Sequence, residues 1–242
     1  MTVPSDKEII TGAKNFVKHM ANFTKLLLNF DTEGKPISQR SGFLYESNDV
    51  LYVITALHGK IVSPVYIETN LVVDGKCVAL SAGDFHYLQN INTPNDFIDI
   101  ACSRFPIETI RDQISKDPKL AGQTISMLGY RGPICLPIAG EAYGFCSVKG
   151  EHLVPTDRGY NFEKMAVAEV GMEYVSDNIK GEHLFALSGK FKGDEIYRGC
   201  SGSPVCDPNK RVVSILLGRE SDSQLLRGAN LTILPQIIKN LP

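Results

Sequence analysis

The sequence has no excess of charge of either sign and no apolar run long enough to cross a membrane. Its 242 residues include 25 Lys and Arg against 27 Asp and Glu, which gives a net charge of −2. No cluster of basic residues stands out, so nucleic acid is not expected as the main ligand. The longer apolar runs, such as Val50–Ile54 and Ile215–Leu217, fall far short of the roughly 20 residues that a spanning helix needs. We therefore expect no membrane span.

Metal-binding and secretion motifs are also missing. None of the six cysteines belongs to a CxxC pair or to a Cys/His cluster with zinc spacing, so neither a structural metal nor a cofactor is expected. The start of the chain lacks the basic and apolar segments of a secretory signal, which predicts a cytoplasmic location; export by a signal-independent route stays open. In that setting reduced, mostly buried thiols are favoured over disulfides.

The first residues instead have the pattern of a helix start. Ser5-Asp6-Lys7-Glu8 is a capping box, in which the Ser and Glu side chains each satisfy a backbone N–H of the first turn. An apolar stripe at helical spacing follows, formed by Ile9, Ala13, Phe16, Val17 and Met20. We predict an amphipathic helix over Ser5–Met20, within an N-terminal extension of residues 1–24.

Most of the remaining chain consists of short runs rich in β-branched and aromatic residues, separated by turn residues, which is typical of an antiparallel β protein. Glu46–Asp49 is predicted as a hairpin turn between two such runs. The predicted strands are Lys25–Phe30, Gly42–Tyr45, Val50–Thr55, Val65–Ile67, Asp99–Phe105, Thr124–Leu128, Tyr143–Val148, Met165–Val170, Ser203–Cys206 and Val212–Leu217. The expected fold class is therefore all-β.

A short helix divides the β segments into two groups. Ile107–Lys116 has apolar residues at three- and four-residue steps, and Pro118 follows it. We expect a first closed β unit over residues 25–106, a linker over 107–120, and a second unit over 121–242 that ends in a helix near Leu234–Asn240. Two such units suit a site in the cleft between them.

One loop of the second unit has the composition of a nucleophile loop. Ser201 lies between Gly199 and Gly202, directly before an apolar strand. Glycines permit a tight loop whose backbone N–H groups point into one concavity, as acyl transfer requires for its developing oxyanion. The alternative is a simple glycine-rich turn between strands.

A serine nucleophile needs a base and an acid behind that base. His58 stands at the end of an apolar strand and is followed by Gly59, a better frame than those of the other four histidines. Asp99 opens an apolar strand, where a buried acid must be paired or hydrogen-bonded; Asp96 is its loop-borne competitor. Taken singly, each residue also fits a structural role.

Together these segments resemble the chymotrypsin/trypsin-like serine protease family, in a bacterial or viral intracellular form. Thr55-Ala56-Leu57-His58 resembles its TAAH segment, Asp99-Ile100-Ala101 its DIA segment, and Gly199-Cys200-Ser201-Gly202-Ser203-Pro204 its GDSGGP segment. The three occur in the family's order, and weaker similarity extends over about residues 40 to 240. The resemblance implies two antiparallel six-stranded β-barrels and hydrolysis of polypeptide substrates through an acyl-enzyme.

The resemblance also implies the roles of individual residues. Ser201 would be the nucleophile, His58 the general base and then acid, and Asp99 the group that orients the imidazole. The backbone N–H groups of Gly199 and Ser201 would form the oxyanion hole. Leu216, Leu217 and Gly218 would bind the substrate backbone as an added strand.

Two departures from the family pattern, at Cys200 and Gly59, bear on activation, disulfide formation and the choice of nucleophile. Cys200 replaces the Asp that receives a new N-terminus in zymogens, so activation by that cleavage is not expected, and Ile9–Gly12 is interpreted as helix. Gly59 replaces the cysteine beside the catalytic His. Cys200 is also an alternative nucleophile, but Ser201 holds the nucleophile's place, which leaves Cys200 to pack beneath the loop.

The sequence supports more than one interpretation of substrate specificity and of function. Glu195 lies six residues before Ser201, where trypsin-like members carry the acid that binds basic substrate side chains; the alternative is a solvated loop acid beside Lys190 and Lys192. A non-catalytic member of the fold that binds peptides is the second functional hypothesis. An esterase or acyltransferase is the third, because fold and triad do not determine the acyl acceptor.

Overall fold

The computed structural model describes residues 6–31, 33, 35–58, 65–89, 97–156, 159–221, 223–239 and 241. Its helices are α1 (Asp6–Phe23), α2 (Ile107–Lys116), α3 (Asp194–Tyr197) and α4 (Leu234–Lys239). Its strands are β1 (Thr24–Phe30), β2 (Pro36–Ser47), β3 (Val50–Thr55), β4 (Val65–Val73), β5 (Lys76–Gly83), β6 (His86–Gln89), β7 (Phe97–Arg104), β8 (Ala142–Thr156), β9 (Gly159–Asp177), β10 (His183–Ala186), β11 (Pro204–Cys206), β12 (Val212–Arg219) and β13 (Leu225–Asn230). The predicted all-β class is confirmed.

The strands of the second half close into a ring. β8 pairs with β9, β9 with β10, β10 with β13, β13 with β12, β12 with β11, and β11 with β8, all antiparallel. Closure leaves no free edge among these strands. Their inward side chains include Phe145, Met172, Phe185 and Leu216, which form one buried cluster. This half is a six-stranded barrel, as predicted.

The first half differs from the prediction in its strand number. Its order is β5-β4-β1-β2-β3-β7-β6, seven strands where six were predicted. Neither β5 nor β6 was among the strands named from the sequence, and β6 is a short edge strand that pairs with β7 through His86↔Cys102 and its neighbours. No pairing joins β6 to β5 within the described ranges. A four-residue edge strand carries too little periodicity to be detected in the sequence.

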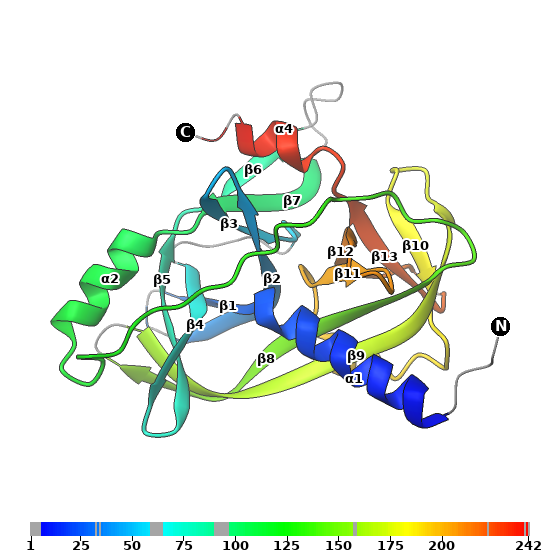
Figure 1. Ribbon diagram of the computed structural model, residues 1–242. Coiled ribbons are helices and arrows are strands. Elements are labelled where there is room, and N and C mark those ends of the chain that lie inside the picture. The colour runs from blue at the N-terminus through cyan, green and yellow to red at the C-terminus, as the bar shows by residue number, and fades with distance from the viewer. Residues whose placement is uncertain are drawn as a thin grey trace.

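A long hairpin joins the two halves. β8 and β9 have 15 and 19 residues, far longer than the predicted runs Tyr143–Val148 and Met165–Val170. The start of β9 pairs with β5, with Cys77 opposite Phe162 and Ala79 opposite Tyr160. Figure 1 shows the hairpin running beneath both halves, with α1 lying along it. The strands thus form one continuous hydrogen-bonded order across the predicted boundary.

Three of the four described helices follow the sequence predictions closely, and α3 was not predicted. α2 has the predicted bounds, and α4 ends one residue before Asn240, which lies outside the described residues. α1 continues three residues beyond Met20, and Ser5 of the predicted capping box is not described. α1 packs on β8: a Cβ added to Gly144 would lie 2.7 Å from the Phe16 ring. The N-terminal helix is therefore part of the scaffold.

The predicted strand Thr124–Leu128 is wrong. The segment forms no strand, because side chains rather than a neighbouring strand satisfy its backbone. The Ser126 N–H donates to Asn70 Oδ1 at 2.6 Å, and Asn70 Nδ2 donates to the Thr124 carbonyl at 3.0 Å.

The predicted hairpin turn is confirmed. Asn48 and Asp49 connect β2 and β3 with φ of 51° and 61°, the left-handed values of a tight hairpin turn.

We expect the junction of β5 and β9 to tolerate no side chain at Gly159. A Cβ there would clash with the Ala79 carbonyl oxygen of the paired strand. Gly159→Ala should therefore lower the free energy of unfolding by about 1–3 kcal/mol, the range for overpacked sites. Urea unfolding followed by circular dichroism measures this change.

Gly12→Ala is the matched control. Gly12 lies inside α1 with open space around its Cα, so an added methyl meets nothing within 4 Å. Alanine is favoured over glycine in a helix by about 0.5–1 kcal/mol, so this variant should be at least as stable as the wild type. Equal effects of the two substitutions would contradict the close approach at Gly159.

Candidate active site

The end of β3 and the start of β7 bring His58 and Asp99 together. The two strands are antiparallel neighbours, with Thr55 opposite Ala101. His58 lies three residues beyond Thr55 and Asp99 two residues before Ala101, so both lie at the same end of the pair. Because this placement depends on strand register, it brings together two residues that are 41 positions apart in the sequence.

The two side chains form a closely held pair. His58 Nδ1 lies 2.6 Å from Asp99 Oδ2, and the His58 backbone N–H donates to Asp99 Oδ1 at 2.6 Å. Both carboxylate oxygens are therefore engaged by one residue, which fixes the plane of the carboxylate and the orientation of the ring. Since an ionised carboxylate only accepts hydrogen bonds, the Nδ1 proton points to Asp99, and in the neutral imidazole Nε2 is then the acceptor.

Ser201 completes the hydrogen-bonded chain. Its Oγ lies 2.9 Å from His58 Nε2, within the reach that proton transfer requires. The same hydroxyl lies 3.0 Å from the Leu217 carbonyl oxygen. One hydroxyl hydrogen can serve only one of these acceptors at a time, so rotation about Cβ–Oγ switches Ser201 between a resting bond and a bond to the imidazole.

The electrostatic environment keeps Asp99 ionised. Burial is the largest influence on its pKa and raises it, but the His58 side chain and the backbone N–H groups of His58 and Leu57 together outweigh burial, so the pKa lies below its usual value. The side chain of Asp99 is 21% exposed and that of His58 is 41% exposed. Solvent and a ligand can thus reach the imidazole, whereas the carboxylate is more sheltered.

Arg40 stands behind this pair and was not singled out in the sequence. It belongs to β2, is buried, and its Nη1 donates to the carbonyl oxygens of Ala56 (2.9 Å) and His58 (3.1 Å). Burial lowers the pKa of the guanidinium and the nearby Asp99 raises it. Arg40 therefore ties the segment that carries His58 to β2. An arginine within a strand is expected to be exposed, so nothing in the neighbouring sequence predicts that Arg40 is buried.

The loop that carries Ser201 packs directly on β2. The Ser41 N–H donates to the Ser201 carbonyl at 2.9 Å, and the Gly202 N–H donates to the Leu216 carbonyl at 2.7 Å. Gly202 has φ of 91°, and a Cβ at this position would clash with the Ser41 carbonyl oxygen. Only glycine fits both the backbone conformation and the space.

The two amides predicted to form an oxyanion hole are available. Gly199 has φ of 82°, and its carbonyl oxygen accepts a hydrogen bond from Ser41 Oγ at 3.2 Å. Among the residues that the structure describes, the N–H groups of Gly199 and Ser201 have no acceptor, while that of Cys200 between them donates to the Tyr197 carbonyl at 3.0 Å. This alternation suits two donors that face a common ligand atom.

A buried lysine supports the same loop from below. Lys149 of β8 is 6% exposed, and its Nζ donates to the carbonyl oxygens of Glu195 (3.1 Å) and Ile196 (2.6 Å). Both carbonyls belong to α3, which leads directly into the loop. Sequence reasoning missed Lys149, because a lysine within a long strand carries no sign of its burial.

Cys200 lies beneath the loop. It is fully buried, and burial raises the pKa of its thiol. Its Sγ is directed to the Ile196 carbonyl, at 3.8 Å. A buried, protonated thiol is a poor nucleophile, so the environment matches the packing alternative. All six cysteines are free thiols.

The predicted specificity residues fall in two places. Leu216, Leu217 and Gly218 lie on β12 beside Ser201, with an irregularity in the pairing with β13 between Leu216 and Gly218. Glu195 instead projects from α3 with its side chain 77% exposed, and it forms an ion pair with Arg198 at 2.8 Å. This position does not supply the carboxylate of a closed pocket and matches the solvated alternative. Asp96 lies outside the described residues.

No family model and no curated protein sequence matches the chain. Solved structures do match. The serine endoprotease from Yersinia pestis is 11% identical, with a TM-score of 0.53 over 98% of this chain and 67% of that one. Tobacco etch virus protease complexed with product is 11% identical, with a TM-score of 0.54 over 99% and 82%. A scabies mite inactivated protease paralogue is 12% identical, with a TM-score of 0.57 over 93% of both chains.

These similarities define the fold. The chain has a chymotrypsin-like protease fold, as the sequence motifs indicated. Since one of the similar structures is an inactivated paralogue, the fold alone does not decide between catalysis and binding, and the site has to carry that argument. Among the described residues, no helix has the length and apolarity to cross a membrane and no group of three metal-ligating side chains is found.

The low pKa of Asp99 predicts how stability depends on pH. Because the folded-state pKa lies below the unfolded value of about 4, the contribution of the carboxylate is fully present above that value and is lost as the pH falls through the folded-state pKa. Asp99→Asn should therefore lose less stability than the wild type between about pH 5 and pH 3. Urea unfolding across this range measures the difference.

Asp74→Asn is the control for this experiment. Asp74 lies in an exposed turn with φ of 51°, a conformation that asparagine also adopts readily. This variant should keep the acid dependence of the wild type. If Asp99→Asn also kept it, the ionised Asp99–His58 pair would not stabilise the fold.

Proposed function

We propose that this protein is a serine endopeptidase that hydrolyses peptide bonds of polypeptide substrates through an acyl-enzyme. The observation that carries the proposal is the continuous hydrogen-bonded chain from Asp99 through His58 to Ser201. His58 and Asp99 belong to the first β unit (residues 25–106) and Ser201 to the second (residues 121–242), so the site lies where the two meet. The elements on both sides are held by strand pairing, which keeps the three groups in place.

The arrangement supports the following steps. The Ser201 hydroxyl attacks the substrate carbonyl carbon while His58 Nε2 accepts its proton, and the imidazolium that forms is stabilised by Asp99. The same imidazolium then donates the proton to the leaving amine, and water repeats the sequence to release the acyl group. Asp99 is suited to this role because it stays ionised at low pH.

The backbone supplies the remaining groups. The N–H groups of Gly199 and Ser201 would donate to the oxyanion of the tetrahedral intermediate, where each donor contributes about 10²–10³ in rate. Leu217 and Gly218 would hold the substrate as an extended strand beside Ser201, whereas both backbone groups of Leu216 are already bonded to Gly202 and Ser203. The Leu217 carbonyl would release the Ser201 hydroxyl hydrogen when the hydroxyl turns toward His58.

A serine-directed covalent probe tests the nucleophile. A fluorophosphonate should label the wild type at Ser201, as detected by intact and tryptic mass spectrometry, and should fail to label Ser201→Ala. Cleavage of a denatured protein substrate should fall by about 10⁴-fold or more in kcat/KM, the scale of losing a triad nucleophile.

Ser188→Ala is the matched control, because Ser188 is exposed and lies outside the triad. It should label and cleave as the wild type does. A wild type that is folded but neither labelled nor active would support the alternative of a peptide-binding protein. Labelling at Ser201 together with hydrolysis of an ester substrate, but without peptide cleavage, would support an esterase.

Lys149 should act as a positioning residue for the oxyanion loop. Its ammonium holds two carbonyls of α3, so Lys149→Met should let the Gly199 amide shift and lower kcat by about tenfold or more, within the cost of losing one oxyanion donor. KM should change little, since the substrate-binding strand is untouched. Steady-state kinetics with a peptide substrate separates these effects.

Lys180→Met, at an exposed turn, is the control and should leave kcat unchanged. A loss of stability with a normal kcat per enzyme molecule that the fluorophosphonate labels would show that Lys149 only supports the fold.

A further inference from the structure

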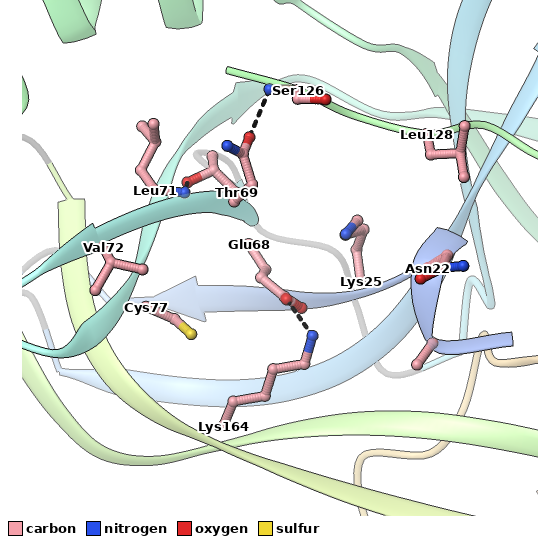
Figure 2. A pocket seen from close by; sticks show the side chains of 12 residues that line it. Asn22, Lys25, Glu68, Thr69, Leu71, Val72, Cys77, Ser126, Leu128 and Lys164 are labelled. Carbon is pink, nitrogen blue, oxygen red and sulfur yellow. Dashed lines mark hydrogen bonds and ion pairs between the residues drawn. The ribbon is translucent and has the colours of Figure 1, made fainter. Parts of the chain in front are cut away.

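A pocket lies away from the candidate active site. It has a volume of about 440 Å³ and is formed by the end of α1, β1, β4, β5, β9 and the extended segment of residues 123–128. None of His58, Asp99 and Ser201 lines it. Figure 2 shows its charged side chains, Lys25, Glu68 and Lys164, which come from three different strands. The pocket is therefore a product of the tertiary structure.

The charges in this pocket do not balance. Lys25 and Lys164 supply two ammonium groups, whereas Glu68 supplies the only carboxylate among the residues that line the pocket. Both oxygens of Glu68 are already engaged: Oε1 accepts from Lys164 Nζ at 2.6 Å, and Oε2 accepts from the Leu26 N–H at 3.0 Å. One positive charge is left over.

Among the described residues, Lys25 is the pocket lysine that has no hydrogen bond or ion pair of its own. The residue is 8% exposed, although charged side chains are rarely buried without a partner. Figure 2 shows its nitrogen without a hydrogen bond to any of the residues drawn. Burial lowers the pKa of this ammonium, Glu68 raises it, and Lys164 lowers it further. A buried cation costs free energy unless an anion accompanies it.

We propose that this pocket binds a small organic carboxylate, with its oxygens on Lys25 and its chain against the apolar wall. A monoanion cancels the single surplus charge, whereas a dianion would leave a surplus negative charge beside the Glu68 carboxylate. Charge-assisted hydrogen bonds from ammonium to carboxylate are among the stronger polar contacts in proteins. Leu71, Val72 and Leu128 line the same pocket and offer an apolar surface to a short aliphatic chain.

The site is independent of the proposed peptidase activity. It requires only Lys25, Lys164 and the walls of the pocket, and it predicts binding in a protein whose Ser201 has been replaced or blocked. Calorimetric titration of the full chain carrying Ser201→Ala, at constant ionic strength, removes any contribution from binding at the nucleophile. The probes are butyrate, inorganic phosphate and butylamine.

We expect saturable binding of one butyrate per chain, weaker binding of phosphate, and none of butylamine. In the same Ser201→Ala background, Lys25→Met should weaken butyrate binding at least tenfold, and Lys164→Met at least threefold, because Lys164 also shares its charge with Glu68. Lys14→Met, on the exposed face of α1, should change the affinity less than twofold.

The proposal is overturned if butyrate does not bind saturably, if phosphate binds more tightly than butyrate, or if the lysine variants bind as their parent does. Circular dichroism and urea unfolding establish that each variant is folded. Should Lys25→Met fail to fold, Lys164→Met decides the matter, because its side chain is 32% exposed and Lys25 still compensates the charge of Glu68 in that variant. An unchanged butyrate affinity in that variant rules the site out.

Discussion

The close contact between Gly202 and β2 is the constraint on which the candidate active site depends. The loop reaches Ser41 so closely that its backbone hydrogen-bonds to the strand and excludes any side chain at Gly202. β2 also carries Arg40, which binds the carbonyls of Ala56 and His58. One strand therefore positions both the nucleophile loop and the base. Because β2 is paired on both sides, it flexes little, and the distance between Ser201 and His58 varies little with it.

Buried cations support the backbone around the site. The nucleophile loop itself contains no acidic residue between Gly199 and Ser203. Lys149 satisfies two α3 carbonyls beneath that loop, and Arg40 satisfies two carbonyls beside His58. Both cations bind backbone oxygens, which offer partial negative charge in a fixed geometry. Such contacts rigidify the backbone that holds the catalytic groups.

The hairpin of β8 and β9 unites the two halves into one structure. If the two β units shared no strand pairing, only side-chain packing between them would determine the relative position of His58 and Ser201. Here β9 pairs with both β10 and β5, so backbone hydrogen bonds connect the halves. The same strand delivers Lys164 to the pocket that contains Lys25 and Glu68. The length of this hairpin therefore accounts both for the connection between the two halves and for the position of Lys164 in the pocket.

The sequence by itself determined the local elements and the chemical groups. Helical spacing predicted α2 with its observed bounds, turn residues predicted the hairpin at Asn48 and Asp49, and motif context pointed to His58, Asp99 and Ser201. These signals lie within a few neighbouring residues, where backbone preference and side-chain chemistry act directly.

Only the tertiary structure decided what depends on distant partners. The segment 124–128 has strand-like residues but no strand beside it, since Asn70 occupies its backbone. Arg40, Lys149 and Lys25 are charged residues whose burial cannot be recognised locally, and Glu195 proved exposed although its position suggested a pocket. Burial and pairing are set by what the rest of the chain brings alongside, and this information is spread over the whole fold.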